Sequence, residues 1–98
     1  MFSLVIYEDD EIELRYEKGE DDNFLFLHIV FNHLNRKILR ELHFRLEWAK
    51  ELASFMGYSE LYTYTQNIKA AKLSKDIIYC NPVTVEGQVF EVYKWELK

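Results

Sequence analysis

The sequence predicts an α+β fold in which a mixed, mainly antiparallel sheet, in β-β-β-α-β-α-β-β order, carries one long and one short helix. Three observations predict it. Three strand-like segments separated by short polar turns come first, a long amphipathic segment follows, and β-branched and aromatic residues dominate most of the remainder. With 98 residues, 49% of them apolar, the chain is expected to form a single domain over residues 1–98.

The first three strands are predicted from hydrophobic patterning. Residues 2–7 are mostly apolar, and residues 11–17 alternate apolar with charged side chains, as in a strand with one wet face. Residues 24–31 are apolar on both faces, so we expect a central strand covered on both sides. Consecutive strands with short connections favour an antiparallel meander.

The strongest pattern is an amphipathic helix over residues 32–58, which should end near Gly57 because glycine suits a left-handed cap. A helical crossover makes the strands on its two sides parallel. Arg45 projects from the apolar arc, with Glu41 one turn earlier. Two interpretations stay open: an ion pair at the helix edge, or a charged pair that lines a cleft.

The last third of the chain predicts three strands and a short helix. Residues 61–65 have strand composition, and residues 67–75 have the pattern of a short helix with outward lysines. A strand over residues 77–80 is expected to be broken by Asn81-Pro82, and a turn at residues 86–88 leads into a last strand over residues 89–97.

Charge and composition exclude several classes of function. The net charge is −5, and residues 8–22 hold nine acidic residues against Arg15 and Lys18, so a nucleic-acid partner is not expected. No apolar run reaches the roughly 18 residues that span a bilayer, so no membrane partner is expected. A single cysteine, Cys80, agrees with a reducing, cytoplasmic location, and we expect a buried, unreactive thiol.

The start of the long helix is a candidate anion site. Arg36 and Lys37 follow the central strand closely, where free backbone N–H groups and the helix dipole favour a phosphate. The stretch has no glycine for close backbone approach, so an ordinary solvated helix start remains the alternative. The three histidines lack the spacing of a metal motif, and no metal site is predicted.

Two segments match motifs of one known family. Residues 35–42 follow a predicted strand and are similar to an Arg-Gly-x-Gly-x-Gly/Ala-like loop. Ile38, Arg40 and Leu42 match this pattern, whereas Lys37 and Leu39 stand where glycines are expected. Residues 67–75 are similar to an Asn-x-x-Ala-x-x-Phe/Leu-Tyr motif, with Ser74 in the place of the tyrosine.

On these grounds residues 24–97 resemble the GNAT acyltransferase superfamily, in the form of a minimal member of the kind seen among short phage-encoded sequences. The resemblance implies a GNAT-like fold. Because the loop glycines and the tyrosine are replaced, it first implies a chain with eroded acyl-CoA motifs that binds a protein partner as an accessory or host-directed, phage-type factor.

The resemblance also leaves open an active acyl-CoA-dependent N-acetyltransferase that modifies an amine of a protein or a small molecule, with acetyl-CoA as its cofactor. Asn67 and Ser74 would then be the catalytic candidates. The implied cofactor-binding residues are Val30, Phe31, Arg36, Lys37, Ile38, Leu39 and Arg40. An exposed strand edge would in addition allow a homodimer.

Overall fold

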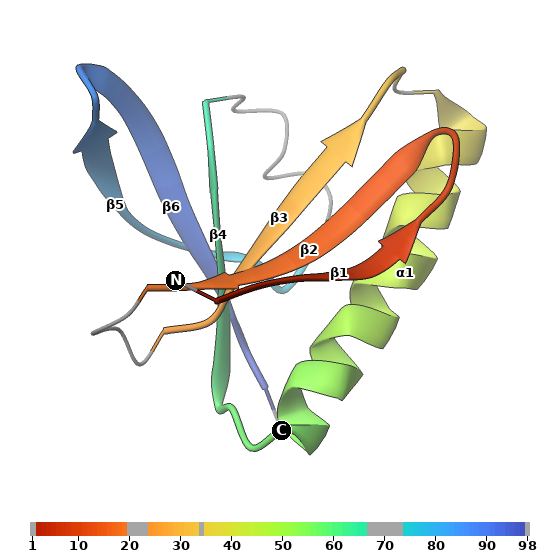
Figure 1. Ribbon diagram of the computed structural model, residues 1–98, viewed down its shortest axis with the longest axis horizontal. Helices are drawn as coiled ribbons and strands as arrows, with labels where there is room; N and C mark the ends of the chain where they lie inside the picture. Colours follow the sequence, from red (N-terminus) through yellow and green to blue (C-terminus); the bar gives the residue numbers. More distant parts are fainter. Residues whose placement is uncertain (1, 20–23, 34, 67–73, 98) are drawn as a thin grey trace.

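The structure, a computed structural model, describes residues 2–19, 24–33, 35–66 and 74–97. Within them, six strands form one sheet, and helix α1 (Arg36–Phe55) lies across one face of it (Figure 1). The strands are β1 (Phe2–Glu8), β2 (Ile12–Lys18), β3 (Phe26–Phe31), β4 (Glu60–Thr65), β5 (Ile78–Val85) and β6 (Gln88–Glu96).

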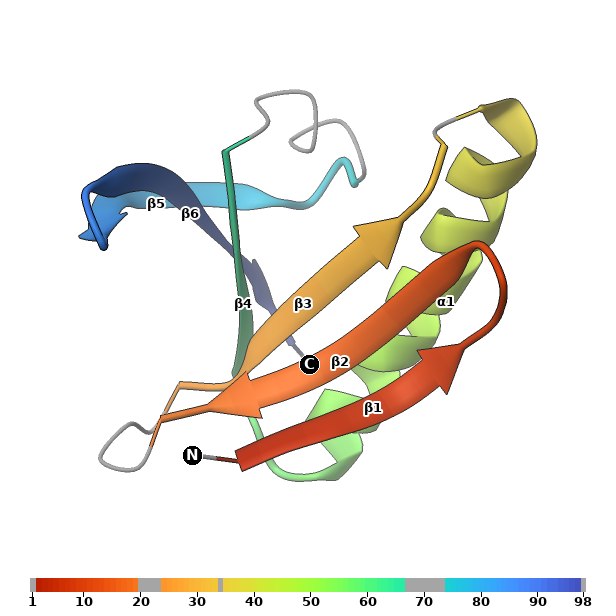
Figure 2. The same cartoon turned by 45° about the horizontal axis from the view of Figure 1, so that its top comes forward.

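The sheet has the order β1-β2-β3-β4-β6-β5, and β3 and β4 are its parallel neighbours. That parallel pairing follows from the α1 crossover, as expected from the sequence. One residue pair, Phe26 with Tyr62, joins the two strands in register, and the Tyr62 N–H donates to the Leu25 carbonyl at 2.9 Å. Beyond this point β3 and β4 diverge (Figure 2). The sheet therefore consists of two antiparallel halves that meet at a narrow seam.

The predicted order with two helices is wrong for the part of the chain that the structure describes, where the order is β-β-β-α-β-β-β. Most of the predicted short helix, residues 67–73, lies outside the described residues. Its last residues, Ser74 and Lys75, are not helical. The Ser74 hydroxyl donates to the Asp76 carboxylate, a local side-chain bond that favours a turn over a helix.

The strand predicted over residues 77–80 is also longer than expected. β5 continues through Asn81 and Pro82 to Val85, because β5 is an edge strand, where proline is tolerated, and because a bulge lies between Tyr79 and Asn81. Its hairpin to β6 turns through Glu86 and Gly87, which both have positive φ, as a two-residue turn of the primed type requires.

The hydrophobic core lies between α1 and the sheet. The alternation predicted for the second strand is confirmed, since its apolar side chains point to the helix and its charged ones do not. The Tyr16 hydroxyl donates to the Ala49 carbonyl at 2.5 Å and ties β2 to α1. The buried members are Ile12, Leu14, Tyr16, Leu25, Leu27, Ile38, Leu42, Leu46, Ala49, Ala53, Leu61 and Trp95.

The ends of α1 are set by its caps. The Asn35 side chain accepts a hydrogen bond from the Ile38 N–H at 2.9 Å, so the helix begins at Arg36 rather than at residue 32. Gly57 follows the last turn with φ +98°, and the Tyr58 N–H returns to the Ala53 carbonyl at 3.1 Å. The predicted left-handed glycine cap is therefore confirmed.

Arg45 and Glu41 form the ion pair that was one of the two predicted alternatives, with 3.2 Å between Nε and Oε1. The Arg45 guanidinium also stacks on the Tyr7 ring of β1, 3.9 Å from its centroid. The charge thus lies at the helix edge beside β1, paired and partly exposed.

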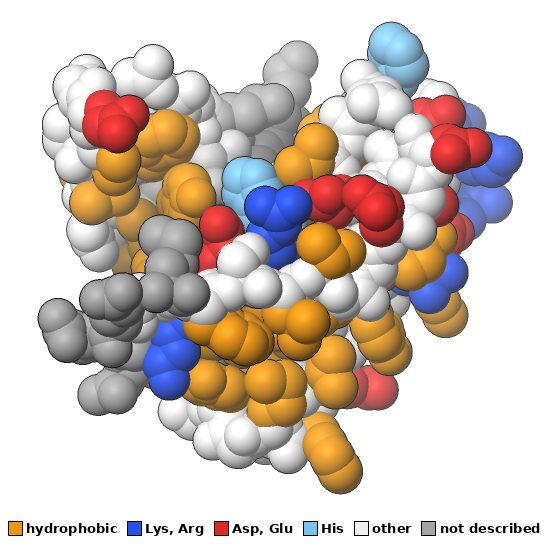
Figure 3. Space-filling view, in the orientation of Figure 1, with side chains coloured by type: hydrophobic (Ala, Val, Ile, Leu, Met, Phe, Trp, Pro, Cys, Tyr) orange, Lys and Arg blue, Asp and Glu red, His pale blue; other side chains and the backbone are white. Residues whose placement is uncertain are grey.

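Among the described residues no helix covers the second face of the sheet, which the sequence did not predict. β3 was expected to be covered on both sides, but Phe26 and His28 are half-buried and Val30 is exposed, because α1, the helix of the described residues, covers the opposite face. Hydrophobic side chains also gather beside β1 and along α1 in the space-filling view (Figure 3). No helix in the described segments is long and apolar enough to cross a membrane.

Candidate functional site

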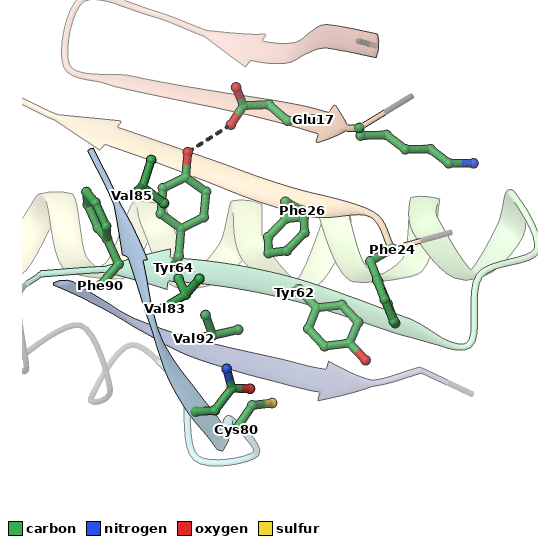
Figure 4. A pocket seen from close by; sticks show the side chains of 13 residues that line it. Glu17, Phe24, Phe26, Tyr62, Tyr64, Cys80, Val83, Val85, Phe90 and Val92 are labelled. Atoms are coloured by element: carbon green, nitrogen blue, oxygen red, sulfur yellow. Dashed lines mark hydrogen bonds between the residues drawn. The ribbon is translucent and has the colours of Figure 1, made fainter. Parts of the chain in front are cut away.

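An apolar cleft of about 690 Å³ occupies the sheet face that α1 does not cover. Its floor is formed by Phe24 and Phe26 in and just before β3, by Tyr62 and Tyr64 of β4, and by Phe90 and Val92 of β6. β5 adds Val83 and Val85 to the lining (Figure 4). Its lining consists of Glu17, Lys18, Gly19, Phe24, Phe26, Tyr62, Tyr64, Cys80, Asn81, Val83, Val85, Phe90 and Val92. The volume is in the range of about 300–1,000 Å³ that is typical of ligand sites.

Five aromatic rings run in a connected row along the cleft. The Phe24 and Tyr62 ring centroids are 5.0 Å apart, those of Phe26 and Tyr64 are 5.9 Å apart, and those of Tyr64 and Phe90 are 5.5 Å apart, all with edge-to-face geometry. Phe26 also lies 5.7 Å from Tyr62 and closes the row. Each contact holds a ring in place, so the floor is preformed rather than assembled around a ligand.

One carboxylate, Glu17, lies among the lining residues. It accepts a hydrogen bond from the Tyr64 hydroxyl at 3.4 Å and lies 3.8 Å from Nδ1 of His28. No lysine or arginine of the described residues pairs with it. Burial, and then the nearby Glu17 carboxylate, raise the pKa of Tyr64, so its hydroxyl stays a neutral donor at neutral pH.

Of the other charged residues near the cleft, Glu60 and Lys94 pair with each other, whereas Lys18 contacts a tyrosine. The Tyr62 hydroxyl donates to Glu60 at 2.9 Å, and Glu60 binds Lys94 at 2.6 Å. The pKa of Tyr62 is raised by burial and by this hydrogen bond. Lys18 places its ammonium 5.6 Å from the centroid of the Tyr58 ring. Glu17 is therefore the carboxylate of the lining that has no lysine or arginine partner among the described residues.

Cys80 is half-buried and lines the cleft, so the expectation of a buried thiol is wrong. Its sulfur lies 3.9 Å from the Ile78 carbonyl oxygen. Neither a histidine nor a helix N-terminus of the described residues lies beside it, and either would be needed to activate a nucleophile.

A second, smaller cavity of about 60 Å³ lies where β3 and β4 diverge. It is lined from β3, β4 and β6, and Trp95 is among its residues. The Trp95 side chain is fully buried, and its indole N–H has no hydrogen-bond partner in the described part of the chain. A buried donor without a partner is costly, so this cavity suits a water molecule or a ligand oxygen.

The structure brings together the basic residues predicted to bind a cofactor. Arg36, Lys37 and Arg40 are exposed on the first turns of α1 and form no ion pair within the described residues. The Ile38 side chain is buried in the core, whereas Leu39 is 40% exposed. The Asn35 side chain occupies the Ile38 N–H, one of the donors that an anion would use.

The other predicted site residues lie apart from this group. Val30 is exposed and Phe31 is half-buried at the end of β3. Ser74 is buried and donates to Asp76, which also accepts from Lys50 of α1 at 2.6 Å. This arrangement links α1 to the segment before β5 and engages the Ser74 hydroxyl with Asp76. Asn67 lies outside the described residues.

Sequence reasoning missed the cleft, although the spacing of its aromatic residues shows which of them share a face. Tyr62 and Tyr64 belong to the strand predicted over residues 61–65, and Phe24 and Phe26 to the strand expected to be covered on both sides. The i, i+2 spacing places each pair on one face.

The described residues contain no group of three His, Cys, Asp or Glu side chains that could hold a metal ion. Comparisons with protein-family models, with curated proteins and with solved structures find no match to this chain.

Proposed function

We propose that this chain is a protein-binding accessory module that holds a short segment of its partner in the apolar cleft. The cleft is the observation that supports the proposal. A cleft of about 690 Å³ with an aromatic floor has the size and chemistry of a recognition site. The resemblance to GNAT-type chains with replaced cofactor motifs agrees with a role in binding rather than in acyl transfer, as an accessory or host-directed factor of the phage type.

The partner segment is expected to combine an apolar anchor with a basic residue. Val85 and Phe24 leave about half of their surface exposed, so an aromatic or aliphatic side chain would bury them. Glu17, without a lysine or arginine partner in the described residues, can accept a charge-assisted hydrogen bond at the rim. The acidic excess of residues 8–22 adds attraction for a basic segment.

A library of random twelve-residue peptides displayed on phage tests this proposal, with the full chain immobilised. We expect enriched peptides in which an aromatic or aliphatic residue lies next to Lys or Arg. Val85→Lys should weaken their binding by about tenfold or more, because it places an ammonium in the cleft. Glu17→Gln should weaken it less and reduce its salt dependence.

Thr84→Lys is the matched control, because Thr84 is the exposed β5 neighbour of Val85 and does not line the cleft. It should leave peptide affinity within about twofold of the wild type. Failure to enrich any peptide, or equal losses for the two lysine variants, would show that the cleft is not a recognition site.

A second candidate function is supported by the opening between β3 and β4. An acyl-CoA could place its pantetheine arm along the diverging strands and its phosphates near Arg36, Lys37 and Arg40, since α1 begins shortly after β3 ends (Figure 2). The unpartnered Trp95 N–H could donate to an acyl oxygen in the small cavity. This is the acyl-CoA-dependent N-acyltransferase that the resemblance leaves open.

Isothermal titration with acetyl-CoA separates the two functions. The second candidate requires saturable binding that Arg36→Ala weakens and Lys75→Ala, away from the helix start, does not. An absence of heat at millimolar acetyl-CoA would dismiss it and leave the protein-binding module untouched.

A further inference from the structure

The two edges of the sheet differ in how they are protected. β5, at one edge, has a bulge between Tyr79 and Asn81 and carries Pro82, both of which obstruct pairing with another strand. β1, at the other edge, has a register shift of the same kind between Val5 and Tyr7. Like β5 it is free of charged residues, here from Phe2 to Tyr7, but it has no proline. β1 thus differs from β5 in having no proline, so no backbone N–H group is missing from its paired segment.

Apolar side chains border the β1 edge on the helix side. Phe2 and Leu4 lie opposite Lys18 and Tyr16 in register, which places them on the face that α1 covers, yet they are 45% and 47% exposed. The helix does not reach far enough to bury them. Hydrophobic side chains gather there in the space-filling view (Figure 3).

The flank of α1 next to β1 continues this apolar surface. Arg45 lies on this flank, because it contacts Tyr7 of β1. Trp48 and Phe55, three and ten residues after Arg45, lie on the same side of the helix. Trp48 is 38% exposed, and Phe55 is 89% exposed. An edge strand and a neighbouring helix flank therefore present one apolar surface, which favours a protein partner that supplies both a strand and apolar side chains.

We propose that this partner is a second copy of the chain, paired antiparallel through β1 with the two-fold axis at Leu4. This register places Phe2 opposite Ile6 and Ser3 opposite Val5, so that no charged residues face each other, and the two Glu8 residues lie at opposite ends. An isologous contact of this kind brings the same apolar flank from both copies. The two sheets become continuous, and the cleft on the uncovered face stays accessible.

Self-complementarity favours this occupant over an unrelated strand. An uncharged segment can lie antiparallel to itself without repulsion, despite a net charge of −5 on each chain. The acidic residues of the β1–β2 turn lie beyond the paired segment. Pairing satisfies backbone groups of the outer edge, and the exposed Phe2, Leu4 and Trp48 gain neighbours on the helix side.

Disulfide trapping tests the register. In a Cys80→Ser background, Leu4→Cys places two thiols at the axis, where directly opposed residues have Cα atoms about 4.5–5.5 Å apart, within the range that a disulfide bridges. We expect most of the chain to run as a covalent dimer after mild oxidation. Thr84→Cys in the same background, an exposed thiol on the protected edge, should stay monomeric.

Sedimentation velocity gives a second, independent measurement. The wild-type chain should sediment as a dimer at micromolar concentration, and Leu4→Lys should raise the dissociation constant at least about 100-fold, because two ammonium groups would meet at the axis. Val85→Lys has the same added charge on the other edge and should remain dimeric.

Three results would overturn the proposal. These are a wild-type monomer at high micromolar concentration, equal trapping of the Leu4→Cys and Thr84→Cys chains, and a Leu4→Lys chain that stays dimeric with a native circular dichroism spectrum. Peptide capture by the cleft is measured separately with Val85→Lys, so this proposal and the proposed function can fail independently.

Discussion

At the residue scale, Tyr16 shows how one polar atom is accommodated in an apolar core. Its side chain is fully buried, and its hydroxyl reaches the Ala49 carbonyl of α1. Burial raises the pKa of Tyr16 to about 12, so the phenol remains a neutral hydrogen-bond donor under all physiological conditions.

Tyr16→Phe should therefore destabilise the fold by about 1 kcal/mol at neutral pH, because it removes a buried hydrogen bond and leaves the ring in place. Urea denaturation at pH 7 measures the loss. The difference from the wild type should shrink between about pH 10 and 12, where the unfolded tyrosine ionises and the folded one does not. A variant as stable as the wild type would show that the bond adds nothing.

Residues also show where prediction from sequence works and where it fails. The alternation of Ile12, Leu14 and Tyr16 with charged residues predicts β2, because a period of two is typical of a strand with one buried face. Phe24 to Phe31 has no such signal: a segment that is apolar on both faces looks the same whether the second face is covered or open. Local pattern therefore predicted the strand but not the cleft.

At the element scale, the boundaries of α1 depend on single residues. Gly57 has φ +98°, and a Cβ added there would meet no atom within 4 Å beyond its chain neighbours, so the strain of a side chain is confined to the backbone. Gly57→Ala should cost about 1 kcal/mol, and Gly57→Asn less, because asparagine tolerates left-handed conformations better. Thermal unfolding ranks the variants; the reverse order would contradict this origin of the cap.

The link between α1 and β5 depends on pH. Burial alone would lower the pKa of Lys50, but its hydrogen bonds to Asp76 and Glu47 outweigh burial and raise it. The Lys50 ammonium, and then the Ser74 hydroxyl, lower the pKa of Asp76. A carboxyl with a lowered pKa stabilises the fold above its unfolded pKa of about 4 and loses that contribution as pH falls.

Asp76→Asn should accordingly cost up to about 1 kcal/mol at pH 7, a modest value because the Asp76 side chain is 55% exposed. The loss should disappear as pH falls from about 4 to 2, where the wild-type carboxyl is protonated as well. Asp10→Asn, a surface change in the β1–β2 turn, controls for the lower net charge and should have little effect. Parallel losses at pH 7 and pH 2 would contradict the ionic origin.

Some elements could be predicted from the sequence and others could not. The long helix was predictable because its apolar stripe repeats over several turns. The end of the predicted second helix was not predictable, because the Asp76 carboxylate accepts hydrogen bonds from Ser74 and from Lys50, and Lys50 lies far from it in the sequence. Pro82 led to a wrong prediction of the end of β5 for a similar reason. A proline breaks a central strand but is tolerated in an edge strand, and only the order of the sheet shows that β5 is at an edge.

At the scale of the whole molecule, two halves of the sheet meet at the seam between β3 and β4. Besides the Phe26–Tyr62 pairing, the Thr63 hydroxyl donates to the Leu27 carbonyl at 2.9 Å and joins the halves. The helix-side core spans both halves, with Leu27 on one and Leu61 on the other. The seam therefore depends on few hydrogen bonds. The one made by the Thr63 side chain can be removed by substitution.

Thr63→Val keeps the shape of the buried side chain and removes the hydroxyl that crosses the seam. It should lower the free energy of unfolding by about 1 kcal/mol, because the Leu27 carbonyl loses a buried partner. Thr84→Val makes the same change on the exposed face of β5 and should stay within about 0.5 kcal/mol of the wild type. Urea denaturation of both variants gives the comparison. Equal stabilities would mean that packing against α1, and not this hydrogen bond, holds the two halves together.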